Sequence, residues 1–158
     1  MRSVRRAEQG DSEALAAVAH RSITITAASA YSDEQVQAWA ALLTGATLNY
    51  AIANTAMFVV ENDLTTSGFA NLAITPNGRA EVDFLFVDPD FIGQGIARLA
   101  VEAVEEEARS QKIERLWADA SLLAAPVFEH FGFVVEERYE KHVGSVVYPN
   151  TWLRKTLV

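Results

Sequence analysis

The change of hydrophobic period along FLFVDPDFIGQGIARLAVEAVEEEAR, residues 84–109, constrains the fold of this chain more than any other feature. Its apolar run stops at Asp88-Pro89, and two glycines, Gly93 and Gly95, follow. From Ile96 onward the apolar residues recur at helical spacing, which predicts one apolar stripe. The residues predicted to point away from that stripe are Arg98, Glu102, Glu105, Glu106 and Arg109. We therefore expect a buried strand, a loop nearly free of side chains, and a helix.

The start of such a helix is suited to binding an anion. About four backbone N–H groups lack partners there, and the same end carries partial positive charge. Glycines at 93 and 95 leave room for a bulky phosphate, although two glycines also suit a tight strand-to-helix turn. The Rossmann pattern fails because residue 98 is Arg, and the chain has no Gly-Lys-Ser or Gly-Lys-Thr. A bound phosphate would therefore be held in neither the Rossmann nor the P-loop manner.

The remaining pattern predicts one domain over residues 1–158, with a capping box from Ser32 and Gln35 and a hairpin turn at Pro76–Gly78. The expected strands are residues 3–7, 56–62, 68–76, 79–89, 113–120, 133–144 and 151–157, and the expected helices are residues 12–28, 32–45, 96–109 and 124–132. Gly45 is expected to end the second helix, and residues 47–54 to add only a short turn. This order indicates an α+β, or mixed α/β, fold. Its sheet would be mostly antiparallel, with about seven strands and about four flanking helices.

Two carboxylates lie on the strand before the glycine loop. Strict alternation puts one set of side chains on each face: Val82, Phe84 and Phe86 on one, and Glu81, Asp83, Leu85 and Val87 on the other. Two carboxylates this close would raise one pKa toward neutrality, as a general base requires. Otherwise they bind a cationic substrate, or are simply solvated positions on a half-exposed strand.

Composition narrows the partners. The formal net charge of −8 gives no drive toward nucleic acid or an anionic membrane and suits a small cationic amine, although it also simply favours solubility. No apolar run is long enough to span a bilayer, and the N-terminus does not resemble a signal peptide, so we expect a cytoplasmic protein. The absence of cysteine excludes thiolate chemistry, and the three histidines lack metal-ligand spacing, so no metal is expected.

The segment VDPDFIGQGIARL resembles motif A of the GNAT acetyltransferase superfamily. Val87 and Pro89 fit its Val-x-Pro element, and Gly95 and Ala97 fit its glycine positions. Ile92 departs from the motif, which has Gln or Arg there. In the family, backbone amides of this loop hold the pyrophosphate of acetyl-CoA.

A second segment, SLLAAPVFEHFGF, resembles another signature of the same family. Ala124, Glu129, Gly132 and Phe133 match it, whereas Ser121 replaces an asparagine and Phe128 replaces a tyrosine. The order of elements also resembles the family's order, and the ends of the chain look like one uncharacterised bacterial branch.

The resemblance implies direct acetyl transfer from acetyl-CoA, as cosubstrate, to a primary amine of a small molecule or a peptide N-terminus. Dimers are common in the family, so a homodimer is one expected assembly. The alternative is a non-catalytic acyl-CoA-binding module, which the departures at Ile92 and Phe128 favour. A nucleotide-binding regulator would need a phosphate-binding lysine motif that the chain lacks.

The resemblance also assigns roles to individual residues. Those expected to bind the cofactor are Leu85, Phe86, Val87, Ile92, Gly93, Gln94, Gly95, Ile96, Ala97, Ser121 and Phe128. Glu81 is the first candidate for the general base, and Asp83 is the second. Phe128 cannot donate a proton, so Ser121 or Tyr139 would assist the leaving thiolate. Alternatively no help is needed, because a thiol has an ordinary pKa of about 8.5. Tyr31 is the candidate for contact with the substrate.

Overall fold

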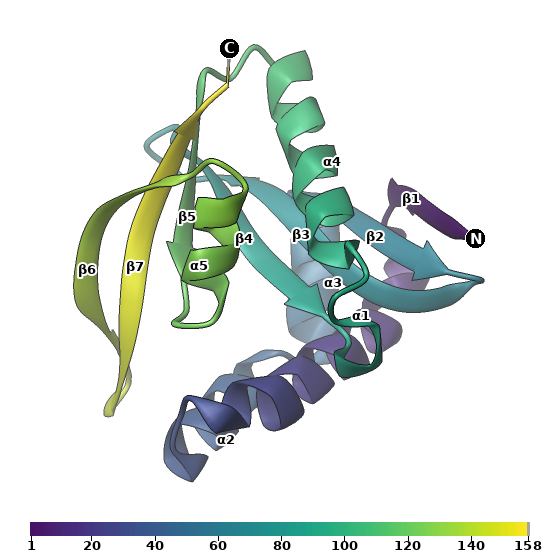
Figure 1. Ribbon diagram of the computed structural model, residues 1–158. Helices are drawn as coiled ribbons and strands as arrows, with labels where there is room; N and C mark the ends of the chain where they lie inside the picture. Colours follow the sequence, from purple (N-terminus) through teal and green to yellow (C-terminus); the bar gives the residue numbers. More distant parts are fainter. Residues whose placement is uncertain (158) are drawn as a thin grey trace.

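The seven strands of the protein form a single sheet in the computed structural model, which describes residues 1–157 (Figure 1). Val158, the last residue of the expected domain, lies outside the described residues. The strands are β1 (Arg2–Arg6), β2 (Ala56–Asn62), β3 (Thr65–Ile74), β4 (Ala80–Val87), β5 (Arg115–Ala120), β6 (Val134–Val143) and β7 (Val146–Thr156). Their order is β1-β2-β3-β4-β5-β7-β6, and only β4 and β5 pair in parallel. The predicted mixed, mostly antiparallel sheet is confirmed.

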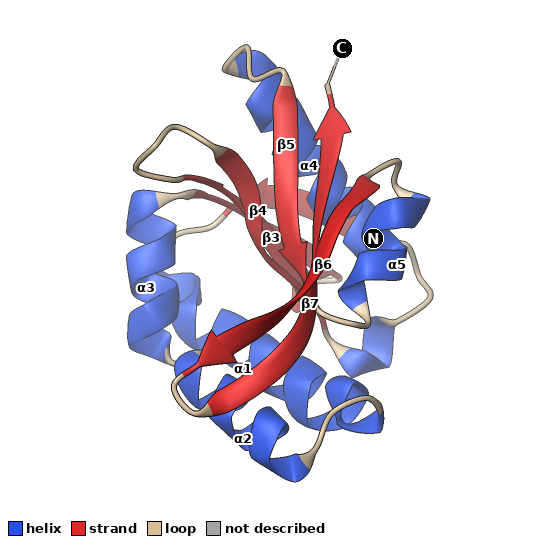
Figure 2. Cartoon of the chain, turned by 90° about the vertical axis from the view of Figure 1, so that its left-hand side faces the viewer, coloured by secondary structure: helices blue, strands red, loops and turns tan. Residues whose placement is uncertain are grey.

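Helices cover both faces of this sheet (Figure 2). They are α1 (Ser12–Arg21), α2 (Asp33–Leu42), α3 (Gly45–Asn54), α4 (Ile96–Ser110) and α5 (Ala124–His130). One buried cluster joins α4 and α5 to their face, and a second joins α1, α2 and α3 to the other. None of the helices in the described part of the chain is both long and apolar enough to cross a membrane.

The region between α2 and α3 differs from the prediction. The capping box is present, because the Gln35 N–H donates to Ser32 Oγ at 3.2 Å and the Ser32 N–H to Gln35 Oε1 at 2.8 Å. Gly45, however, begins α3 rather than ending α2, and α3 is a ten-residue helix capped by Thr44. A Cβ atom at residue 45 would meet only the end of the Glu13 side chain, which is exposed and can move aside, so the Thr44 cap is what marks the start of α3.

A β-bulge in β4 overturns the predicted division of its two faces. Ala70 pairs with Leu85 but Leu72 pairs with Val82, so two residues of β4 stand opposite the single residue Asn71. Val82, expected beside Phe84 and Phe86, therefore packs in the α4–α5 cluster together with Leu85. The buried Asn71 side chain accepts the Phe84 N–H at 2.6 Å, which satisfies a backbone group at the bulge.

Glu105 on α4 is a second correction. It was predicted to point toward solvent, yet it is only 4% exposed. Lys155 of β7 reaches its carboxylate with Nζ–O distances of 2.9 and 3.1 Å. A long cation from a strand remote in sequence allows a carboxylate to lie beside the apolar stripe.

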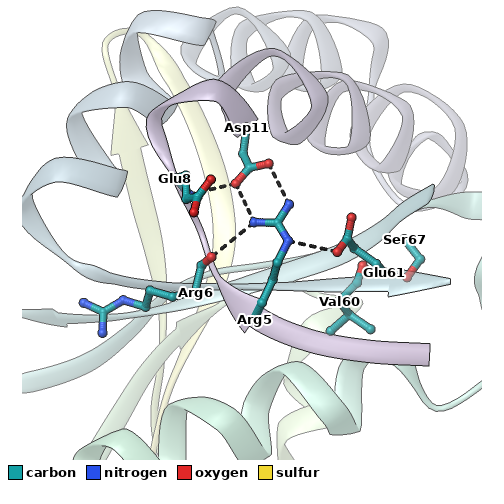
Figure 3. Close-up of polar contacts among 7 residues, drawn as sticks. All are labelled: Arg5, Arg6, Glu8, Asp11, Val60, Glu61 and Ser67. Carbon is teal, nitrogen blue, oxygen red and sulfur yellow. Dashed lines mark hydrogen bonds and ion pairs between the residues drawn. The ribbon is translucent and has the colours of Figure 1, made fainter. Parts of the chain in front are cut away.

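At the other end of the sheet, Arg5 joins three elements (Figure 3). Its guanidinium binds both oxygens of Asp11 at 2.8 Å and Oε1 of Glu61 at 2.9 Å. Hydrogen bonding to Arg5 holds the pKa of Asp11 below its usual value. This network ties β1 to β2 and to the turn that leads into α1.

Candidate active site

A cavity of about 360 Å³ opens where β4 and β5 diverge. These parallel strands pair only through Glu81↔Trp117 and Val82↔Ala118. Residues 83–87 of β4 continue without a partner on β5, and the two strands separate toward α1 and α2 (Figure 1). The split exposes backbone polar groups in the middle of the sheet, where an extended ligand can bond to them.

One end of the cavity adjoins the glycine loop. Seven of the predicted cofactor residues line the cavity, five from the segment between β4 and the start of α4 and two from the second signature: Leu85, Phe86, Val87, Ile92, Ala97, Ser121 and Phe128. Gly93, Gln94 and Gly95 lie in the loop itself, outside the lining residues, and Ile96 is buried beneath it. The structure thus brings most of the predicted cofactor residues together, with Ile96 serving the core.

The loop presents an open helix start. Gly93 and Gly95 have φ values of +80° and +82°, in the left-handed region that favours glycine. Gly95 is the N-cap of α4, and no side chain caps the first backbone N–H groups. The preceding turn is fixed by Asp88, which accepts the Asp90 N–H and binds Arg21 Nε, each at 2.9 Å. These features leave backbone donors directed toward a bound anion.

The predicted carboxylates occupy different environments. Asp83 lines the cavity, whereas Glu81 does not and lies 3.7 Å from Arg79 Nε. The Asp83 side chain remains exposed to the open cavity, but desolvation by the surrounding protein raises its pKa. The Asp119 charge also raises this pKa, while Lys141 and Asn71 partly offset the rise. Burial also raises the pKa of Glu81. Among residues 1–157, no cation lies within ion-pair distance of Asp83, so its charge is available to a ligand.

Asp119 of β5 is a site residue that the sequence reasoning missed. Its Oδ2 accepts from Tyr139 Oη at 2.7 Å and pairs with Lys141 Nζ at 3.0 Å, while Oδ1 accepts from Asn150 Nδ2 at 2.9 Å. Asp119, Lys141 and Asn150 line the cavity, but Tyr139 does not. Burial and the bond to Asp119 raise the pKa of Tyr139, which makes it a poorer proton donor. In the sequence, only the alternation of side chains along β5 could have indicated Asp119. Its hydrogen-bond and ion-pair partners lie on β6 and β7, far away in the chain.

Aromatic side chains form the wall beside α2. Tyr31, Trp39, Phe86 and Tyr148 all line the cavity, and of these Tyr31 was the predicted substrate contact. The Tyr31 hydroxyl accepts the Leu122 N–H at 2.8 Å, which brings the segment before α2 against the end of β5.

Two predicted residues lie around α5: Ser121 in the turn before it and Phe128 within it. Ser121 Oγ accepts the Ala124 N–H at 3.3 Å. Phe128 is buried and packs edge-on against Phe133, with ring centroids 5.0 Å apart. Within residues 1–157, no group of three or more His, Asp or Glu side chains is arranged to hold a metal ion.

Comparison with known proteins agrees with this geometry. A family model described as an acetyltransferase (GNAT) domain matches residues 27–151. The uncharacterized N-acetyltransferase YafP of Escherichia coli (strain K12) is 27% identical over 153 residues, covering 96% of this chain and 93% of that protein. A GCN5-related N-acetyltransferase from Rhodopseudomonas palustris superposes with a TM-score of 0.90 at 28% identity, over 98% of this chain and 95% of that one.

A second solved structure is similar in fold. It is the PaiA N-acetyltransferase of Thermoplasma acidophilum in complex with coenzyme A. Its TM-score is 0.82 at 22% identity, and the match covers 99% of each chain.

Proposed function

We propose that this chain, a member of the GNAT acetyltransferase family and an acyl-CoA-dependent N-acetyltransferase, transfers the acetyl group of acetyl-CoA directly to a primary amine. The amine would belong to a small molecule or to a peptide N-terminus. One observation carries the proposal: a single cavity extends from the β4–β5 split beside the glycine loop to the unpaired carboxylate of Asp83. Cofactor and amine can thus meet without a covalent enzyme intermediate.

The glycine loop would hold the cofactor's pyrophosphate. The uncapped N-terminus of α4 supplies backbone N–H groups and partial positive charge. Ile92, half exposed at the cavity, offers no polar side chain, so binding would depend on these backbone donors. The pantetheine arm would extend between β4 and β5, where the fold leaves strand edges unpaired. The similar PaiA structure is in complex with coenzyme A, which supports coenzyme A as a ligand of this fold.

Asp83 would accept a proton from the substrate's ammonium. Its raised pKa makes it a better base than an ordinary aspartate. The neutral amine attacks the thioester carbon, and the nitrogen of the tetrahedral intermediate loses its extra proton to water. The C–S bond then breaks to give the amide and the CoA thiolate. Ser121 lines the same cavity, and its hydroxyl can hydrogen-bond this thiolate, whose ordinary pKa of about 8.5 makes strong acid catalysis unnecessary.

Binding and thiol release together test the proposal. Calorimetry should show binding of acetyl-CoA and CoA, and ATP-selective binding would contradict it. Asp83→Asn should lower kcat/KM in a thiol-release assay by about 10²–10⁴-fold, the usual contribution of a general base. Acetyl-CoA affinity should stay unchanged in that variant, which separates loss of the base from loss of the fold.

Glu81→Gln is the matched control, since it removes the neighbouring carboxylate that lies outside the cavity lining. A large loss in this variant together with an active Asp83→Asn would transfer the role of base to Glu81. If the unaltered protein binds acetyl-CoA but releases no thiol with any amine, it is instead a non-catalytic acyl-CoA-binding module.

A further inference from the structure

The aromatic wall of the cavity is pre-organised by contacts among its own rings. Tyr31 and Trp39 meet edge-to-face at 5.6 Å, and Tyr148 lies 6.1 Å from Tyr31 and 6.4 Å from Trp39 between ring centroids. Phe86 lies 6.2 Å from Trp39 and closes the wall on the β4 side. Tyr31, Phe86 and Tyr148 are buried, at 8%, 8% and 6% exposure, and Trp39 is half-buried, so Trp39 offers the most accessible ring surface. The neighbouring rings hold Trp39 in place, which allows it to receive a flat group without reorganising.

The polar ends of both tyrosines are directed to the backbone. The Tyr31 hydroxyl accepts the Leu122 N–H, and the Tyr148 hydroxyl donates to the Gln35 carbonyl, both at 2.8 Å. The part of each side chain left for the cavity is therefore mainly its ring. Leu43 and Val143 extend the same lining with aliphatic groups. Hydroxyl residues also line the cavity, at Ser22, Thr26 and Thr47, but most of the lining around the rings is apolar. The amides of a peptide backbone would lose hydrogen bonds to water against this apolar surface.

The charges in the cavity allow one positive charge in the ligand. Its ionisable acidic and basic lining residues are Asp83, Asp119 and Lys141. Asp119 and Lys141 neutralise each other at 3.0 Å, which leaves Asp83 as the carboxylate without an ion-pair partner among residues 1–157. A second ammonium would find no free carboxylate. A carboxylate on the ligand would face Asp83 and a lysine that is already paired.

We propose that the acceptor is an arylalkylamine: one primary ammonium on a short chain, carrying an aromatic ring and no carboxylate. The ammonium binds Asp83, and the ring packs against Tyr31, Trp39 and Tyr148. This proposal rests on the acetyl-transfer function proposed above and narrows its acceptor from amines in general to one chemical class.

Initial rates of thiol release at saturating acetyl-CoA test it on the unaltered protein. The panel is 2-phenylethylamine with four comparators. n-Propylamine lacks the ring and phenylalanine adds a carboxylate. Spermidine lacks the ring and adds charges, and a trialanine amide lacks the ring and presents a peptide N-terminus. We expect kcat/KM for 2-phenylethylamine to exceed each comparator by at least tenfold. Higher kcat/KM for spermidine, phenylalanine or the peptide would overturn the arylalkylamine assignment while leaving the acetyltransferase function intact. No release with any amine would instead refute the proposed function.

Variants locate the ring. Trp39→Leu, which keeps an apolar side chain but removes the aromatic wall, should raise KM for 2-phenylethylamine about tenfold and leave KM for n-propylamine within twofold. Tyr50→Leu is the control, because Tyr50 is 72% exposed and outside the cavity lining, and its kinetics should not change. Acetyl-CoA affinity and the melting temperature show that each variant is folded. An unchanged KM for 2-phenylethylamine in folded Trp39→Leu would contradict the placement of the ring.

Discussion

Replacing Lys155 with methionine should destabilise the protein far more than the loss of an ordinary surface lysine. Lys155 Nζ binds both oxygens of Glu105, at 2.9 and 3.1 Å, and donates to the Phe131 carbonyl at 2.8 Å. The Glu105 side chain is only 6% exposed, so without Lys155 a buried carboxylate would lose its main partner. Methionine keeps an unbranched side chain of similar length, which confines the change to the charge and its hydrogen bonds.

The magnitude follows from what remains around Glu105. Breaking a fully buried ion pair costs about 3–5 kcal/mol. Arg109 Nη2 still lies 3.3 Å from Glu105 Oε1, but this arginine is 48% exposed and screened by solvent. Lys155 is itself 24% exposed, so water can replace part of its contribution. We therefore expect a loss of about 2–3 kcal/mol in the free energy of unfolding, or about 5–10 °C in Tm for a chain of this length.

Urea unfolding followed by circular dichroism measures this loss, with Lys112→Met as the control, since Lys112 is exposed and has no ion pair within residues 1–157. Adding Glu105→Gln to Lys155→Met should recover at least half of the loss, because no charge then remains buried. Acetyl-CoA affinity should change little in either variant. A loss below about 0.5 kcal/mol in Lys155→Met, the range of ordinary surface substitutions, would refute the account of Glu105 as a buried charge that depends on Lys155.

Three further predictions concern the cavity and its loop. Gly95→Ala should lower the free energy of unfolding by about 1–2 kcal/mol, because it places a side chain on a left-handed residue, and calorimetry should show weaker acetyl-CoA binding. Gly78→Ala is the control: its φ is +86° in a distant hairpin turn, so it should lose the same stability and leave acetyl-CoA binding unchanged. Phe128→Tyr should change kcat less than about threefold in the thiol-release assay, because a thiolate needs little help to leave, and a tenfold rise would show that protonation limits the reaction. Asp83→Asn should gain Tm relative to the unaltered protein as pH rises from about 4 to 8. The folded state raises the pKa of Asp83, so the unaltered protein loses stability as the pH rises and this carboxyl ionises in the folded state. Asparagine does not ionise, so the variant avoids this loss. A Tm difference that stays constant across this pH range would contradict the prediction.

Local patterns in the sequence predicted most of the secondary structure. The capping box of Ser32 and Gln35, the hairpin turn ending at Gly78 and the switch of period at Gly95 each act over a few residues, and the structure contains all three. Gly45 was assigned to the wrong helix because a glycine between two helical segments is compatible with either the end of one or the start of the next. The Thr44 side chain decides between them, because it accepts the Thr47 N–H and so caps a helix that begins at Gly45.

The site depended on the tertiary structure to a greater extent. Strict alternation cannot reveal the bulge opposite Asn71, because the extra residue is visible only in the pairing of β4 with β3. The polar network around Asp119 requires β6 and β7 to pair beside β5, although nothing near Asp119 in the chain indicates its partners.

The sequence by itself determined the strand, the bare loop and the helix at residues 84–109, together with the family resemblance, because backbone preferences and side-chain period are local properties. Only the tertiary structure decided that Asp83 faces a cavity with its charge unpaired, that Asp119 is neutralised by Lys141, and that rings from three separate elements form one wall. Charge balance and cavity shape depend on which side chains meet across the sheet, and long-range strand pairing sets those meetings.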